Sequence, residues 1–363
     1  MNQVGAPRQQ ENCRFLQKLP QELRDEVYDL VFSSTRFCFG ERTVSRIGTR
    51  RVVSANRGRS LSLLRTCHQI HDEVGQKWLH QALFIFENPE ALLDKLTPLS
   101  VSTLSQIKHM RISGDTMMVS WGYDDVYYRT AQVLKLLPGL NLDRLTVMGM
   151  KHASISYETL SKLIVSSSGW KSMRYLSHNS ELLGFVGPQG LHPQELFSRQ
   201  PQPMSWQNLL DERDGRTTAP SVTVYRSNSP TRGSVLTPGK RTIYCQLPVP
   251  RDRLVDYGTQ KDQALMQPGE REKEILIIVK RGAGITYAEE NPAPLLSGGD
   301  IREDSPAQTW AQIKAVSKEM SRFSDDDSEQ SDDDLEHGTA NVLVDEYSNV
   351  DDYTWPPFHF MKQ

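Results

Sequence analysis

Apolar residues recur at helical spacing near the start of the chain, after a polar lead (residues 1–14). Four of them follow one another at i, i+4, i+7 and i+8, the period of one face of a helix: Leu23, Val27, Leu30 and Val31. Pro20 and Glu22 suit a first helical turn, where proline is tolerated and an acidic side chain faces the positive end of the helix. The pattern predicts a helix from about Pro20 to Phe32.

The pattern of hydrophobic and polar residues changes after the first helix and changes again at Ser60. Short β-prone pieces between residues 35 and 59 are separated by Gly40, Gly48 and Gly58, which predicts a small β-hairpin or meander. A longer helix is then expected from Ser60 to about Gln81, and its apolar face would carry Leu64, Cys67, Ile70, Val74 and Trp78. We expect this helix to pack against the first one.

Strands and helices then alternate. "ALFIF" predicts a strand and "NPEALLDKLT" a helix, and three later segments, which begin at Ile107, Leu142 and Trp170, share apolar residues at positions 1, 4 and 6. Helical patterns lie between these segments, at 125–137 and 157–167. The alternation predicts a parallel sheet, either as an ordinary α/β layer or as a short, irregular array similar to leucine-rich repeats.

The rest of the chain divides by composition. Residues 183–204 are rich in Pro, Gly and Gln and are expected to be a linker, whereas 205–288 contain three strand-like runs that predict a small antiparallel β element. Residues 289–363 predict a largely disordered acidic tail with a helix around "TWAQIKAVSKEM". With 15–182 as the main domain, the predicted class is α+β: N-terminal helices with a hairpin insertion, an irregular α/β layer, a small β element and the tail.

Composition indicates an intracellular protein, cytoplasmic or nuclear. Of 363 residues 37% are hydrophobic, and no apolar run approaches the roughly 20 residues that span a bilayer, so no membrane partner is expected. The four cysteines are sparse, which is typical of a reducing compartment. The net charge of −3 conceals an asymmetry between the two parts of the chain. The segment from Ser324 to the end contains 12 acidic residues and one lysine, and the residues before Ser324 contain 33 acidic and 41 basic residues. The body is therefore +8 and the tail −11.

Catalytic and metal-binding signatures are weak. The sequence contains no GxxxxGK[ST], GxGxxG, GxSxG or HExxH motif, and its clustered carboxylates lie in the tail, where nothing positions them. Cys67 and His71 share a helix face, but two ligands do not make a zinc site. We therefore expect a binding protein rather than an enzyme, with no cofactor and no metal.

Six arginines fall within 18 residues of the expected hairpin: Arg42, Arg46, Arg50, Arg51, Arg57 and Arg59. They form a candidate basic patch for phosphates or an acidic partner. Cationic side chains also protect the edges of small hairpins from association, and we favour this interpretation. Because aromatic residues are nearly absent from the cluster, nucleic acid is not the expected partner.

Two stretches carry a family resemblance. "LPQELRDEVYDLVF" (19–32) followed by "LSLLRTCHQIHDEV" (61–74) resembles the F-box-like proteins of filamentous fungi, over about residues 15–115. The resemblance implies docking onto the Skp-type adaptor of a cullin ubiquitin ligase, with an unknown protein substrate captured by the following domain. By that resemblance the adaptor-facing residues would be Leu19, Pro20, Leu23, Val27 and Leu30.

The sequence departs from the F-box proper at one place, because about 28 residues separate the two matching helices where the family has a short connection. Two interpretations of the first helix therefore remain open, adaptor docking or packing within this chain. An exposed apolar stripe on residues 19–31 would favour docking, and a buried one internal packing.

The acidic tail suggests a different function. Ser324 and Ser331 each precede three aspartates, a context that resembles the sites of acidophilic kinases. The alternative to adaptor docking is thus a regulatory or nucleic-acid-associated protein whose basic body is shielded by its own tail.

Overall fold

The computed structural model describes residues 13–46, 49–54, 61–121, 124–150, 153–184, 201–247, 254–256, 260–262, 264–290, 295–296 and 299–325. Within these ranges the chain combines helices with one large mixed sheet and three small antiparallel sheets. The predicted α+β class is confirmed. None of the described helices is long and apolar enough to cross a membrane.

The large sheet has eight strands in the order β1-β4-β5-β8-β9-β14-β10-β11. Five strands pair in parallel: β1 (Arg36–Phe39), β4 (Leu83–Phe86), β5 (His109–Ser113), β8 (Leu142–Met148) and β9 (Trp170–Ser177). Three more extend the sheet by antiparallel pairing: β14 (Ile275–Lys280), β10 (Ser221–Ser227) and β11 (Arg241–Ile243). The parallel strands predicted from the shared apolar frame at 107, 142 and 170 are confirmed, and the sheet is an α/β layer.

One face of this sheet carries the main core. The helices that contribute to this core include α5 (Pro89–Leu96), α6 (Val101–Leu104), α7 (Thr130–Leu134), α8 (Ala153–Ser166) and α9 (Met204–Asp214). On the opposite face Leu176 and Leu276 pack against Val235 and Leu236 of the 3-10 helix η5 (Ser234–Leu236). Three other 3-10 turns lie in connections: η2 (Glu181–Leu183), η4 (Arg216–Thr218) and η6 (Pro238–Lys240).

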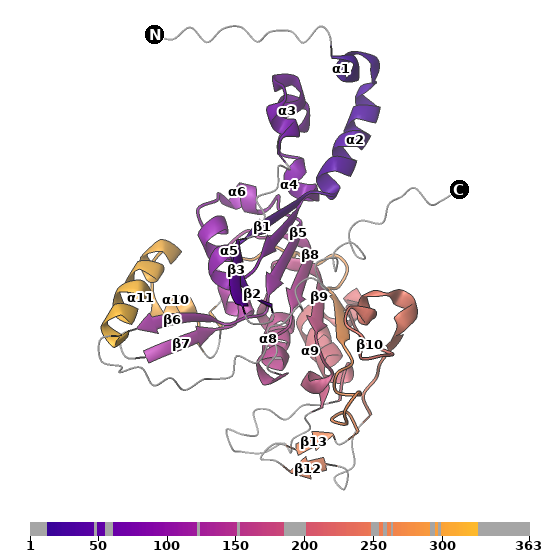
Figure 1. Cartoon of the computed structure of the whole chain (residues 1–363), viewed down its shortest axis with the longest axis vertical. Helices are drawn as coiled ribbons and strands as arrows, with labels where there is room; N and C mark the ends of the chain where they lie inside the picture. The colour runs from indigo at the N-terminus through magenta and orange to yellow at the C-terminus, as the bar shows by residue number, and fades with distance from the viewer. Residues whose placement is uncertain are drawn as a thin grey trace.

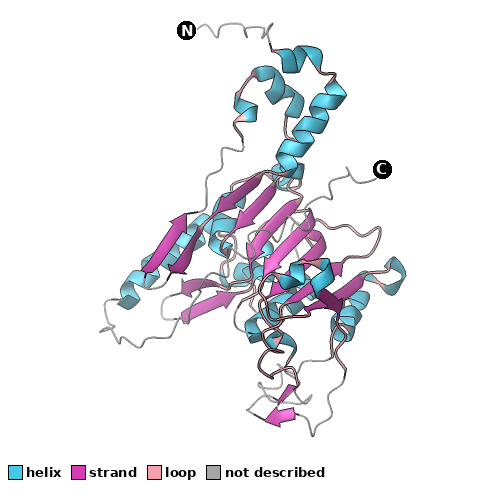
Figure 2. Ribbon diagram, turned by 45° about the vertical axis from the view of Figure 1, so that its right-hand side comes forward, coloured by secondary structure: helices cyan, strands magenta, loops and turns pink. Residues whose placement is uncertain are grey.

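The N-terminal helices form a module that projects from one end of the sheet (Figures 1 and 2). Its elements are α1 (Arg14–Lys18), α2 (Gln21–Ser33), η1 (Leu63–Arg65), α3 (His68–Val74) and α4 (Trp78–Gln81). Tyr28 and Phe32 of α2 pack against Ile70 and Val74 of α3 in a cluster separate from the main core. The predicted contact between the two N-terminal helices is confirmed.

The segment between α2 and η1 joins the module to the sheet. It forms β1, followed by the hairpin β2 (Glu41–Arg46) and β3 (Thr49–Ser54), in which residue 42 pairs with 53 and residue 46 with 49. The predicted hairpin is confirmed. Because β1 is an edge strand of the large sheet, this segment anchors the helical module to the sheet. Helix α2 remains in contact with α3 in spite of the residues inserted between them.

Two predicted helices are shorter than expected. The helix predicted from Ser60 to Gln81 is divided into η1, α3 and α4, because Gly75 adopts a φ of 52° at the end of α3, a conformation that glycine reaches without strain. The helix predicted over 125–137 begins only at Thr130. Its first residues belong instead to the hairpin β6 (Met117–Trp121) and β7 (Asp124–Tyr128), in keeping with the strand preference of valine and tyrosine.

The predicted division of the C-terminal half is corrected in two places. The β element of 205–288 is part of the large sheet, since β14 pairs with β9. Of the expected linker 183–204, the described end is packed, because Gln202 is buried just before α9. A further two-stranded hairpin is formed by β12 (Leu254–Asp256) and β13 (Gln260–Asp262).

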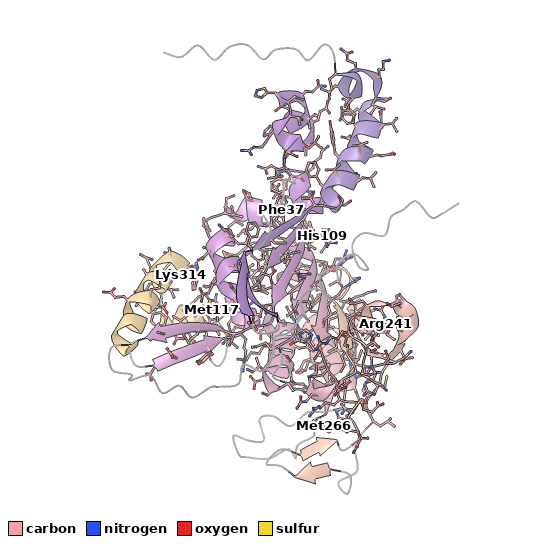
Figure 3. The ribbon with its side chains drawn as sticks, viewed as in Figure 1. Phe37, His109, Met117, Arg241, Met266 and Lys314 are labelled. Atoms are coloured by element: carbon pink, nitrogen blue, oxygen red, sulfur yellow. The ribbon has the colours of Figure 1, made fainter. Side chains whose placement is uncertain are left out.

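Part of the segment after residue 289, which the composition predicts to be largely disordered, is folded in the described residues. They form α10 (Ile301–Asp304) and α11 (Trp310–Asp325), and Ile301, Trp310 and Ile313 are buried in the main core. The predicted helix around "TWAQIKAVSKEM" is confirmed as part of α11. It lies along the β6–β7 hairpin, where the Ser120 amide donates to the Ser317 hydroxyl at 3.0 Å, and Figure 3 labels Lys314 and Met117 at this end of the molecule.

Candidate partner-binding helix

Helix α2 has an exposed apolar stripe. Leu23, Val27 and Leu30 lie on one face of the helix, and their exposed fractions are 45%, 36% and 40%. Pro20 at the start of the helix is exposed, and Leu19 is half-buried. The five residues that the resemblance assigns to adaptor docking therefore lie together, four of them exposed and Leu19 half-buried. An exposed apolar stripe is the arrangement that favours docking over internal packing.

The inward side of α2 explains why the stripe faces outward. Arg24, Tyr28 and Phe32 are the buried residues of this helix. Arg24 donates two hydrogen bonds to Glu73 of α3, from Nη2 at 2.7 Å and from Nε at 3.1 Å, and the Tyr28 hydroxyl donates to the same carboxylate at 2.8 Å. Since these contacts fix the rotation of α2 against α3, the leucines and the valine cannot turn inward.

Arg24 also fixes the bend before α2. Its Nη1 donates to the carbonyl oxygen of Leu19 at 2.7 Å and to that of Leu16 at 3.2 Å. The Leu19–Pro20 junction between α1 and α2 is thereby held to the buried side of the helix. The start of the stripe is positioned by the same side chain that sets the rotation of the helix.

Hydrogen bonding perturbs the ionisation of this network. Burial alone would raise the pKa of Glu73, but hydrogen bonds from Arg24, Tyr28 and Gln69 outweigh burial and hold the pKa below its usual range. Burial, together with the hydrogen bond to Glu73, raises the pKa of Tyr28. The network therefore depends on the charged form of Glu73.

Glu73→Gln is expected to lower the free energy of unfolding by about 1.5–3 kcal/mol, the range for hydrogen bonds to charged groups. Because the pKa of Glu73 is lower in the folded state than in the unfolded one, its contribution is present above the unfolded pKa, about 4.3, and is lost as the pH falls through the lower folded value. Denaturant unfolding between pH 7 and 2 should show a shallower loss of stability in this variant than in wild type. Glu26→Gln, at an exposed position of α2, is the control. Equal pH slopes for wild type and Glu73→Gln would contradict the network.

Acidic residues occupy the third side of α2. Glu22, Asp25, Glu26 and Asp29 follow one another at helical spacing, and all but the half-buried Asp25 are exposed. The helix thus presents an apolar stripe with carboxylates along one margin. A partner that covered the stripe would meet the best charge complement if it carried basic residues along the matching edge.

A pocket of about 260 Å³ opens beside Asp25 and Asp29 on the acidic side of α2, between this helix and the α3–α4 segment. Its acidic lining groups have partners within the module: Glu73 binds Arg24, Asp25 accepts from Gln21 at 3.0 Å, and Asp29 accepts from Gln81. The pocket is consequently part of the internal packing of α2, and we assign no ligand to it.

Of Cys67 and His71, which the sequence places four residues apart, Cys67 has a structural role. The Cys67 sulfur accepts from the Ile70 amide at 3.4 Å and so caps α3, while His71 is exposed. Cys67 was expected on the apolar face of a continuous helix, and its capping position results from the break in that helix. Over the described ranges, no group of three or more His, Cys, Asp or Glu side chains could hold a metal ion.

The other predicted residues are only partly described. The backbone of Arg42, Arg46, Arg50 and Arg51 lies in the β2–β3 hairpin, whereas Arg57 and Arg59 fall outside the described residues. The pairing register puts positions 42, 46 and 51 on one face of the hairpin and position 50 on the other. Ser324 lies in the last turn of α11, and Ser331 is outside the described residues.

The carboxyl end of the parallel strands is where open α/β sheets often bind ligands. Burial raises the pKa of Asp115, beyond β5, and burial together with the charge of Arg232 lowers the pKa of His178, after β9, to about 4. Strand β8 lies between β5 and β9, so about two strand spacings, roughly 10 Å, separate the ends of the strands that precede these residues. We assign no joint role to Asp115 and His178.

Compared with models of known protein families, with curated proteins and with solved structures, the chain matches none of them. Helix α2 and its surroundings are therefore the features from which a function is proposed.

Proposed function

We propose that this chain is a protein-binding receptor of the F-box type, in which α2 docks onto the Skp-type adaptor of a cullin ubiquitin ligase and the sheet domain holds a protein substrate. The observation that carries the proposal is the exposed stripe of Leu23, Val27 and Leu30 on a helix whose opposite face is anchored by Arg24. In this proposal the chain acts by binding and has no catalytic step of its own.

Three further features support docking by α2. The helical module projects from the sheet, so a partner could reach the stripe without contacting the sheet domain (Figure 1). The insertion between the two matching helices leaves α2 packed on α3. The carboxylates beside the stripe would steer a basic partner surface toward it, which gives the association a dependence on ionic strength.

The proposal is tested by titrating the full chain with a purified fungal Skp-type adaptor in a calorimeter. We expect a one-to-one complex with a negative heat-capacity change, the signature of apolar burial, and weaker association at high salt. An adaptor that gives no heat at any temperature, and does not co-elute with the chain in gel filtration, would refute the proposed function.

A further inference from the structure

The large sheet ends in an open edge strand. The strand order ends at β11, so within the described residues no strand pairs with the outer side of β11. The Tyr244 amide donates to the Val224 carbonyl oxygen at 2.8 Å, in continuation of the β10–β11 ladder. The Gln246 amide then donates to the Gln202 carbonyl oxygen at 2.6 Å, just before α9. We call residues 241–247 the β11 edge.

The backbone of the β11 edge alternates between two directions. Thr242 lies opposite Arg226 of β10, and the amides at 244 and 246 bond inward. In an antiparallel ladder the residues between such positions turn their N–H and C=O groups the other way. The backbone groups of Ile243 and Cys245 therefore point away from the sheet, where they offer a template for pairing with another extended chain.

The side chains of the β11 edge also alternate. Tyr244 packs against the main core and Gln246 is buried. Between and beyond them, Ile243 is 69% exposed and Leu247 is 78% exposed. Met204, which begins α9 close to the contact at Gln246, is 63% exposed. These are the three most exposed large apolar side chains of the described residues, and apolar groups that gather in water mark interaction surfaces.

The charges along this part of the chain have one sign. Residues 228–247 contain three basic residues and no aspartate or glutamate. Lys240 is exposed at the start of the edge. Arg241 is held in place, because its Nη1 donates to the Val235 carbonyl oxygen at 3.0 Å and its guanidinium lies over the Tyr225 ring, 4.6 Å from the centroid. A positive edge disfavours pairing with a second copy of itself and favours a partner that carries carboxylates.

We propose that the β11 edge binds the protein substrate as an added strand. The substrate segment would be extended, with apolar residues at alternate positions to cover Ile243 and Leu247, and with an acidic residue at the end that meets Lys240 and Arg241. Naming this segment as the substrate rests on the proposed function, whereas the binding of such a segment to the edge does not require adaptor docking.

The β11 edge is far from the proposed adaptor site. Strands β1 and β11 are the two ends of the sheet order, and the helical module joins the sheet at β1. Seven strand spacings of about 4.8 Å separate them, roughly 34 Å. Figure 3 labels Arg241 on the side of the molecule away from Lys314, and the helical module lies at the top of the same view. An adaptor on α2 and a segment on the β11 edge would therefore not overlap.

A displayed library of random 12-residue peptides, selected on the full chain, tests the proposal. We expect the enriched peptides to share alternating apolar residues with an acidic residue near one end. Synthetic copies of these peptides, labelled with a fluorophore, then give dissociation constants by fluorescence anisotropy. Binding should weaken as the salt concentration rises, because screening reduces the attraction to Lys240 and Arg241.

Two substitutions at Cys245 test the backbone pairing. Cys245→Pro removes the outward N–H at the middle of the edge, and we expect it to weaken peptide binding about tenfold because the peptide carbonyl that it meets is left unpaired. Cys245→Val removes the thiol but keeps the N–H, so it should bind the peptides as wild type does. Equal binding by the proline and valine variants would exclude pairing at this edge.

Substitution of the exposed apolar residues tests their contribution. Ile243→Asp with Leu247→Asp should weaken peptide binding at least about tenfold, since apolar contacts are lost and the new carboxylates repel the acidic residue of the peptide. Leu23→Asp with Val27→Asp, on α2, should leave peptide binding unchanged. The edge variant should in turn bind the adaptor as wild type does, so failure of this inference and failure of the proposed function are separate results.

Three outcomes would overturn the inference. The first is a selection that enriches no peptide. The second is a set of enriched peptides whose binding survives in both Cys245→Pro and the edge variant, or is lost in the α2 variant. The third is a chain that elutes as a dimer in gel filtration and becomes a monomer in the edge variant, which would show that a second copy occupies the edge.

Discussion

Leu23→Asp combined with Val27→Asp is expected to weaken binding of the Skp-type adaptor at least about 100-fold. Central apolar side chains of an interface often contribute 2 kcal/mol or more each, and a carboxylate placed in an apolar groove adds a desolvation penalty. A 100-fold change corresponds to about 2.7 kcal/mol. The dissociation constant from calorimetry with the purified adaptor measures this effect.

The same substitutions should hardly change stability. Both side chains are at least one-third exposed, and exposed substitutions usually alter the free energy of unfolding by about 0.5 kcal/mol or less. Leu99→Asp with Val101→Asp is a matched control, because these residues are of the same types and comparably exposed at 37% and 48%, but lie outside the helical module. If the control variant lost adaptor binding as strongly as the α2 variant, the stripe would not be the docking surface.

Trp310→Ala is expected to lower the free energy of unfolding by about 3–5 kcal/mol, the usual cost of truncating a buried tryptophan. Trp310 is 6% exposed in the main core, and its Nε1 donates to Asp94 of α5 at 2.8 Å. Lys314 of the same helix also donates to Asp94. Urea unfolding of the full chain measures the change.

Trp310→Phe separates the packing of this ring from its hydrogen bond. It keeps an aromatic ring in the core but removes the donor to Asp94, so a loss of only about 1–2 kcal/mol is expected. An unfolding free energy unchanged by Trp310→Ala would mean that α11 does not belong to the folded domain.

The sequence pattern located α2 within one residue at each end but did not determine which side faces inward. Its apolar residues at 23, 27 and 30 have the spacing of a core stripe, and nothing local distinguishes a core stripe from a docking stripe. The inward side is set instead by Arg24, whose partner Glu73 lies 49 residues further along the chain. An arginine would ordinarily be expected at the surface, so the pairing could not be read from the helix alone.

The parallel strands were predicted well because alternation is a local signal. In the segments from Ile107, Leu142 and Trp170 the core-facing residues are at positions 4 and 6, so positions 3 and 5 must point to the other face. Those positions hold Arg111, Arg144 and Arg174, so the alternation alone places these arginines on the face opposite the main core.

The C-terminal part of the domain was missed for a different reason. Glu289 and Asp300 count as charged residues in any compositional estimate of disorder, but both are buried. Glu289 accepts from the Ser168 amide at 3.0 Å and pairs with Lys135, 154 residues away in the sequence. Contacts over such distances depend on the completed fold and leave no local pattern.

Amide hydrogen exchange of the full chain, free and bound to the Skp-type adaptor, tests the central claim most directly. If α2 is the docking surface, adaptor binding should slow exchange in residues 21–33 and leave the central strand β8 (residues 142–148) unchanged. Adaptor binding that slows exchange elsewhere in the chain while α2 exchanges as in the free protein would contradict the account.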